Sequence, residues 1–440
     1  MSTVPKPGVL SSVKGAAGAF VTGQANRWVY IIIGVIAVVL GLIFGIGKIA
    51  EVQAVQATPG NVKRIGGTQV AALSNQHKLR NMNIKNNGLW RGFQDNEKLL
   101  INVSMVGSRL LGYLGPFTNG VFDEDSAVKI ALKAGARLFI LDIDIDNVSG
   151  NPVLVYRDNQ HYVKSLNKGS IKKTVDSLVS RAFSNDSNVV PSNINDTPVI
   201  LILYFHNTPD KIKETAKYIN FLGKVSTYIQ SVNSNLLGQT SVGDFHRQAM
   251  ETQIWFQPWT LLKNKIILLT NVDTAIMRNA SKYGIALSPI MDLDYIVNAT
   301  IYNDTSFSSM SAVSASSKKQ AAVIRTPSYF LNTPPDRIQD VVDSTKQQLT
   351  ICMDPSPTTV YSKEDLDKLI TNFGVNCVPI VNFMSEEQLK PFFGKDNLYD
   401  NKSFIGKLEP LRFTPPVPIT TKIPSPATDT KGGFVALKKY

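Results

Sequence analysis

Three aspartates at the end of one predicted strand are the side chains best placed to do chemistry. Asp142, Asp144 and Asp146 alternate directly after the apolar run 137–141. Side chains two residues apart on a strand point to the same face, so we expect the three carboxylates to lie together. At the C-terminal end of a buried strand they could act in catalysis or ligate a cation. Aspartates at such a place also cap the following loop, and the spacing leaves both interpretations open.

Other reactive side chains are scarce. The 440 residues include two cysteines and four histidines, which excludes a disulfide scaffold and cysteine-based zinc or iron–sulfur clusters. We expect Cys352 and Cys377 to be buried thiols in neighbouring strands, with a disulfide as the alternative. The chain has neither a GxxxxGK[ST] loop nor a GxGxxG turn after a strand. Its net charge of +12 comes from basic residues interleaved with acids, so we predict no nucleic-acid partner.

The elements that must position these residues alternate between strands and helices. Apolar runs predict strands at 99–106, 137–145, 198–205, 265–271, 348–353 and 376–383. Helical patterns lie between them at 123–134, 209–230 and 362–373, and another begins at Ser385. Apolar strands separated by helices indicate a buried parallel sheet. For a domain of this length we favour an α/β fold of the closed (β/α)8 TIM-like barrel type over an open doubly wound sheet.

An uncharged apolar stretch, residues 28–47, precedes this domain. As a helix it is long enough to cross a ~30 Å hydrocarbon core, and Trp28 and Tyr30 would lie at the headgroups. Because signal peptides have shorter apolar cores, we predict a retained single-pass transmembrane helix. Basic residues flank both ends and leave its orientation open.

Three glycines of the predicted span, Gly34, Gly41 and Gly45, fall on one helix face. Such a face permits close packing of a second helix. Glycines scattered through a transmembrane helix without such a role are the alternative.

The chain therefore divides into five parts. We predict a basic N-terminal tail (1–27), the transmembrane helix (28–47), a linker (48–95), the barrel domain (96–413) and a proline-rich tail (414–440). The serine-rich stretch 305–320 is predicted to be a long loop. The C-terminal tail is either a solvated extension or a ligand for a protein partner.

Eight Asn-x-Ser/Thr sequons are present, a number that chance explains in a chain this rich in Asn, Ser and Thr. They would matter only in a secretory compartment, where a lumenal glycoprotein receptor is a third functional hypothesis. The asparagines are Asn102, Asn147, Asn185, Asn195, Asn279, Asn298, Asn303 and Asn401.

Several phrases, taken in order, resemble the catalytic barrel of phosphatidylinositol-specific phospholipase C. GARLFILDIDI (135–145) followed by GNPVLVYRD (150–158) resembles its second strand and the Pro-Val-Val-Tyr-His phrase that follows. PVILILYFHN resembles its third strand. The phrases WTLLKNKIILL, NCVPIVNFM and SFIGKLEPLRF are similar to later parts, so the resemblance covers residues 99–413. Glycerophosphodiester phosphodiesterases share this barrel.

The resemblance implies a phosphodiesterase with two catalytic histidines and, in the eukaryotic type, calcium held by carboxylates and an asparagine. Here the stretch expected to hold the first histidine is 105–110, which has none, and Arg157 stands at the second position. Ile140 and Tyr204 replace two glutamates. Asp142 is retained.

The loss of both histidines leaves no residue to which we assign a catalytic role. Arg109 cannot serve as a base because it stays protonated. His161 and His206 remain as candidates for a rewired acid or base. The resemblance would bring Asp142, Arg109, Arg157 and His206 together at the barrel mouth, where the two arginines could bind phosphate. Alternatively, these charges pair with one another and bind nothing.

The favoured functional hypothesis is a membrane-anchored, catalytically degenerate barrel that serves as a structural or binding component. Its Asn-, Lys- and Ile-rich composition is typical of large DNA viruses, where it would lie in the internal membrane of the virion. The alternative is a divergent phosphoric diester hydrolase acting on phosphoinositide or glycerophosphodiester headgroups. We predict no cofactor or metal, with calcium only in that alternative. The predicted partners are the lipid bilayer and proteins that bind the barrel surface or the tail.

Overall fold

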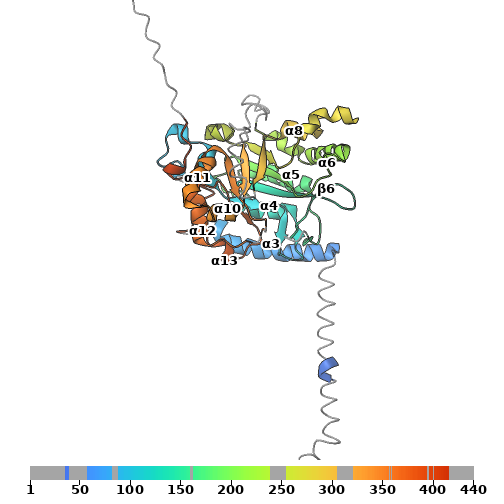
Figure 1. Cartoon of the computed structure of the whole chain (residues 1–440). Helices are drawn as coiled ribbons and strands as arrows, with labels where there is room; N and C mark the ends of the chain where they lie inside the picture. Colours follow the sequence, from blue (N-terminus) through green and yellow to red (C-terminus); the bar gives the residue numbers. More distant parts are fainter. Residues whose placement is uncertain are drawn as a thin grey trace, which may run out of the picture.

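Eight parallel strands form the centre of the molecule (Figure 1). The computed structural model describes residues 35–38, 57–81, 88–158, 162–237, 254–304, 321–355, 357, 359–393, 396–399 and 401–415. Within these ranges the strands, in chain order, are β2 (Gly107–Arg109), β5 (Leu138–Ile145), β7 (Val199–Phe205), β8 (Ile266–Thr270), β9 (Ala299–Asp304), β10 (Ala322–Arg325), β11 (Leu349–Cys352) and β12 (Pro379–Val381).

The strands close into a barrel. Each pairs in parallel with the next along the chain from β2 to β11, and β12 pairs in parallel with β2. The remaining seam is bridged where the Cys352 amide donates to the Cys377 carbonyl at 2.9 Å and Ile351 forms a parallel bridge with Cys377. The predicted (β/α)8 architecture is therefore confirmed, and both cysteines are free and buried.

Helices cover the outside of the barrel. They are α4 (Glu124–Lys133), α5 (Ile171–Ala182), α6 (Thr215–Tyr228), α8 (Leu293–Ile296), α10 (Pro327–Leu331), α11 (Ile338–Gln347), α12 (Lys363–Asp367) and α13 (Glu386–Leu389). The short helical turns are η1 (Asp95–Glu97), η2 (Leu100–Asn102), η3 (Gln230–Ser234), η4 (Ile254–Phe256), η5 (Trp259–Leu262), η6 (Ala275–Tyr283), η7 (Pro289–Met291), η9 (Pro335–Arg337), η10 (Lys368–Asn372) and η11 (Glu409–Leu411).

Local sequence explains where several of these helices begin and end. The side chains of Asp123 and Ser362 accept hydrogen bonds from backbone amides three residues on, and Ser385 forms a reciprocal capping box with Gln388. Such caps satisfy amides that lack helical partners. After α4, Gly135 adopts a positive φ of 83°, which ends the helix without steric cost.

Two layers of apolar side chains hold the barrel together. One fills the lumen, with Ile140, Ile202 and Ile351 among its members. The other lies between the strands and the helices, with Leu141 and Leu203 among its members. Because side chains alternate across a strand, neighbouring residues of one strand join different layers. This explains why the barrel strands are apolar throughout.

The structure differs from the predicted strands in three respects. Within 99–106, β1 (Val103–Met105) pairs antiparallel with β13 (Phe404–Gly406) outside the barrel ladder, and the first barrel strand follows it. Strands β9 and β10 were not predicted, because β9 contains polar residues and β10 is short. Three further strands lie at the mouth: β3 (Tyr113–Gly115) pairs with β4 (Val121–Phe122), and β6 (Pro152–Leu154) extends β5.

The segment predicted as a linker contains a long helix, α3 (Pro59–Asn81). It packs on α4 and the β3–β4 hairpin, with Val70 and Leu73 against Leu114 and Ile130. Figure 1 shows it along one end of the barrel, next to α13. Few of the side chains described in its part 59–75 are buried, which explains why the sequence showed no clear apolar period.

The predicted transmembrane helix, with Trp28, Tyr30 and the three glycines, lies outside the described residues except for 35–38, which are helical. No helix within the described ranges is both long enough and apolar enough to cross a membrane. The serine-rich stretch 305–320 and residues 416–440 also lie outside the described part of the chain.

Candidate functional site

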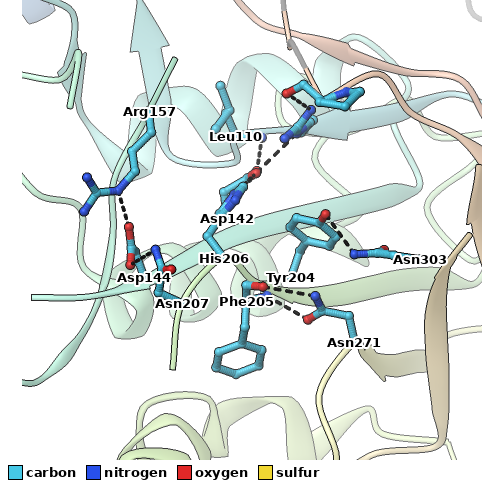
Figure 2. A network of polar contacts seen from close by, with 12 residues as sticks. Leu110, Asp142, Asp144, Arg157, Tyr204, Phe205, His206, Asn207, Asn271 and Asn303 are labelled. Carbon is cyan, nitrogen blue, oxygen red and sulfur yellow. Dashed lines mark hydrogen bonds and ion pairs between the residues drawn. The ribbon is translucent and has the colours of Figure 1, made fainter. Parts of the chain in front are cut away.

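Asp142 is the centre of a polar network at the C-terminal end of the barrel strands (Figure 2). Its carboxylate is buried and accepts three hydrogen bonds. They come from Arg109 Nε at 3.2 Å, the Leu110 amide at 3.1 Å and His206 Nε2 at 2.8 Å. Burial by itself raises the pKa of Asp142, but the Arg109 charge, His206 and the Leu110 amide outweigh it and hold the pKa below its usual value.

Arg109 reaches across the barrel mouth from the end of β2. Besides binding Asp142, its Nη1 donates to the carbonyl oxygen of Asp354 at 2.7 Å and is 3.4 Å from that of Pro355. The guanidinium is thereby fixed between two strands and the loop after β11. The cavity beside it, lined also by Tyr361, Pro379 and others, has a volume of only about 10 Å³, close to the minimum for one water molecule.

Asp144 forms a second buried pair on the same face of β5. Its carboxylate accepts from Arg157 Nε and, at 3.0 Å, from Asn207 Nδ2. The structure thus brings together Asp142 and Asp144, and with them Arg109, Arg157 and His206. In both pairs, however, the positive charge is directed at the protein's own carboxylate.

Asp146 does not belong to this cluster, although its spacing predicted that it would. β5 ends at Ile145, and Asp146 starts the turn to β6. Its side chain accepts from Lys168 at 2.6 Å, Ser149 at 2.7 Å and the Val148 amide at 3.1 Å. The bond from Lys168 is the largest cause of a strongly lowered pKa. Asp146 is a loop cap, so the strand pattern failed where the strand stopped.

Of the two candidate acids or bases, only His206 lies within the described part of the chain, and it is at the mouth. It follows β7, and its amide donates to the Ile143 carbonyl at 2.9 Å, which directs the imidazole toward Asp142. The side chain is 30% exposed, and Nδ1 has no hydrogen-bond partner in the described part of the chain. His161, the other candidate, lies outside the described residues.

Two further polar residues of the mouth, Asn271 and Asn303, were not predicted from the sequence as site residues. Asn303 Nδ2 donates to the Tyr204 hydroxyl at 3.1 Å, and Asn271 bonds with both backbone groups of Phe205 (Figure 2). Asn271 closes the predicted strand 265–271, so its place at a strand end was an available signal. Asn303 lies on a strand that was not predicted.

The carboxylates do not fit a calcium site. Calcium requires six to eight oxygen ligands, and no group of three or more His, Cys, Asp or Glu residues within the described ranges could hold a metal ion. One oxygen of Asp142 and one of Asp144 already bond to an arginine, and the other oxygen of each accepts from the Leu110 amide or the Asn207 side chain, respectively. A cation there would have to displace both guanidinium groups.

Comparisons with known proteins find similarity in structure only. No family model matches the chain, and no curated protein matches it in sequence. Among solved structures, S. officinalis PLC21 and L. pealei PLC21 are each 15% identical over 76% of this chain, with TM-scores of 0.49 and 0.48. The chain spans 40% of the length of each. A calcium-dependent phosphoinositol-specific phospholipase C from Pseudomonas sp. is 9% identical, over 74% of this chain and 100% of its own, with a TM-score of 0.41.

Proposed function

We propose that this chain is a membrane-anchored, phospholipase C-like barrel whose mouth is closed by its own ion pairs, and that it serves as a structural or binding component. The observation that carries the proposal is the pairing of Arg109 with Asp142 and of Arg157 with Asp144. These are the charges that a phosphate ligand would need.

The mouth offers few groups that could act as a general base and little room for a substrate. A general base must be able to accept a proton near neutral pH and lie within reach of the reacting group. A guanidinium group has no lone pair to offer as a base, so neither arginine of the mouth can serve. A phosphodiester would have to displace the Asp354 carbonyl and the Asp142 carboxylate from Arg109, and the adjoining cavity is too small to admit it. Breaking a buried ion pair in this way costs several kcal/mol, on the order of 3–5.

Membrane association is supported by the loops around the mouth as well as by the predicted span. The loops that follow the barrel strands carry exposed apolar side chains, with Val148 91% and Ile212 88% exposed. Lys168 bonds to Asp146 at the start of the turn that carries Val148, and Lys211 directly precedes Ile212. Apolar tips with neighbouring lysines favour contact with an anionic bilayer. Helix α3, which follows the predicted span, lies on this side of the barrel. The composition supports a place in the internal membrane of a virion.

A second candidate function is favoured by the His206–Asp142 hydrogen bond. Because Asp142 is ionised and accepts from Nε2, a neutral His206 carries its lone pair on the partly exposed Nδ1. An aspartate that orients a histidine in this way is a common arrangement for a general base. The corresponding activity is hydrolysis of phosphoinositide or glycerophosphodiester headgroups.

Hydrolysis assays separate the two candidates. The full chain in detergent micelles is given phosphatidylinositol or glycerophosphodiesters, with and without calcium. We expect no turnover above that of His206→Ala. Turnover that His206→Ala abolishes, with unchanged thermal unfolding, would contradict the structural role and establish the hydrolase. Lys129→Ala, which removes an exposed lysine of α4 that pairs with Asp125, is the matched control.

A further inference from the structure

A groove lies at the end of the barrel opposite the mouth, where β7 and β8 begin. Its volume is about 840 Å³, which is large enough for a short peptide segment. It is lined by residues that precede these two strands and by the segment 88–98, including Trp90, Trp259, Lys98, Lys263, Asp95 and Asp196.

The groove has an aromatic wall that is held in place by its neighbours. The half-buried Trp90 ring meets Trp259 edge-on, with centroids 5.3 Å apart, and also meets Phe93 at 5.3 Å. Trp259 in turn packs against Phe404 at 5.2 Å. A ligand that stacks on Trp90 therefore binds a ring already held in place, so binding does not cost the conformational entropy of that side chain.

The rim of the groove is charged but adaptable. Lys98 pairs with Asp95 and Lys263 with Asp196, each at 2.7 Å. Both pairs are exposed, and the Asp95 side chain is 97% exposed. Exposed pairs contribute little stability, so both carboxylates are available to a cation on a ligand.

The last described residues are fastened to the same segment that lines the groove. Arg412 Nη1 donates to the Gly92 carbonyl at 2.7 Å, and its guanidinium lies over Phe93 at 3.6 Å from the ring centroid. Thr414 Oγ1 donates to Glu97 at 3.1 Å. Figure 1 shows the red C-terminal segment beside the light-blue segment, away from α3. The proline-rich tail therefore begins next to the groove.

We propose that this groove is the docking site of the chain's own proline-rich tail, residues 416–426. That sequence, PVPITTKIPSP, contains four prolines. Proline-rich segments prefer the polyproline II helix, which loses little entropy on binding and is recognised by aromatic-lined grooves. At ~3.1 Å per residue these eleven residues extend over ~34 Å as a polyproline II helix. Lys422 supplies the cation that Asp95 and Asp196 can bind.

The test uses a fluorescein-labelled peptide of residues 414–428 and fluorescence anisotropy. A variant that ends at Pro415 has an empty groove and binds the peptide. The full chain binds it at least about tenfold more weakly, because its tethered tail competes at millimolar effective concentration. In the truncated variant, Trp90→Ala weakens binding by about tenfold or more. Tyr295→Ala, an exposed aromatic in a separate surface groove, leaves binding unchanged.

A second test reverses the charges of one proposed contact, so it does not depend on whether Trp90→Ala folds correctly. Asp95→Lys repels the peptide's Lys422, and a peptide carrying Lys422→Glu regains affinity for that variant. Three results would overturn the proposal: no peptide binding to the truncated variant, equal binding by the full chain, or equal binding by Trp90→Ala. Self-association of the full chain that disappears on truncation would also overturn it, because the tail would then come from a second copy.

Discussion

Asp142 stays ionised inside the barrel because three donors surround it, and one of them is a buried guanidinium. The same arrangement satisfies Arg109, which forms no other ion pair among the described residues. Each charge can therefore be buried only because the other is paired with it. Because each side chain neutralises the charge of the other, the pair stabilises the fold and is poorly available to a substrate.

Removing the cation from this pair should destabilise the fold. Arg109→Ala leaves Asp142 buried with only His206 and the Leu110 amide as donors, and we expect a loss of about 3 kcal/mol in the free energy of unfolding. Urea unfolding measures it. Lys129→Ala, which breaks an exposed pair with Asp125, should cost about 0–1 kcal/mol.

The pH dependence gives a second readout of the same variant. Because the folded pKa of Asp142 is lowered, the stability it contributes is present above its unfolded pKa and is lost as pH falls through the folded value. The difference between wild type and Arg109→Ala should therefore be largest near neutral pH and shrink below about pH 4. A difference that does not change with pH would contradict this account.

Lys407 is predicted to oppose folding at neutral pH. It is buried, its Nζ donates to the Thr345 carbonyl at 3.1 Å, and burial, with a smaller effect of Lys346, lowers its pKa to about 7. The unfolded chain then binds more protons, so stability rises with pH from about 7 to about 10. Lys407→Met should raise the melting temperature at pH 7 and flatten this rise. The exposed Lys363→Met serves as control, and equal slopes for Lys407→Met and wild type would refute the prediction.

Among the elements, the seam between β11, β12 and β2 is where the barrel closes. Here Cys377 bridges to Ile351, while Gly107 faces Cys377 from β2. A glycine is required because a Cβ at this position would overlap Cys377 Sγ and lie 3.3 Å from Leu138 Cδ2. The close approach of three strands thus depends on one small residue.

This contact can be tested with a pair of substitutions. Gly107→Ala should destabilise the domain by about 1–3 kcal/mol through overpacking. Cys377→Ala removes the overlapping sulfur, so the double variant should be more stable than the sum of the two single losses predicts. Guanidinium unfolding of all four chains measures the coupling. Strict additivity would show that the strain lies elsewhere.

At the scale of the whole molecule, the two ends of the barrel have different characters. One end carries the ion pairs of Asp142 and Asp144, exposed apolar loop tips and helix α3. The other carries the groove lined by Trp90 and Trp259 and the start of the C-terminal tail. If the predicted span anchors the chain, the first end faces the bilayer and the groove faces away from it.

This orientation can be measured with an environment-sensitive probe. The two native cysteines are buried and burial raises their pKa values, so labelling is confined to an introduced cysteine. A fluorescent label at Val148→Cys should shift to the blue when the chain is reconstituted into anionic vesicles. A label at Leu261→Cys, which is exposed just before β8 at the opposite end, should not. Similar shifts at both positions would contradict the proposed orientation.

The sequence by itself determined the repeating part of the architecture. Apolar strands, caps such as Ser385 and stops such as Gly135 act between near neighbours, so they predicted alternating strands and helices and the strand face shared by Asp142 and Asp144. The length of the domain then favoured a closed barrel. The sequence could not show that Asp146 lies beyond the strand, or that β9 and β10 exist, because short or partly polar strands carry little local pattern.

Only the tertiary structure decided what the mouth contains. Arg109 and Asp142 are 33 residues apart, and Tyr204 and Asn303 are 99 apart. Whether such groups meet a ligand or one another depends on the register between strands, which no local pattern encodes. The same holds for Trp90 and Trp259, which form one groove wall from distant segments. The sequence shows which residue types are present, but the closure of the barrel decides which of these side chains contact one another.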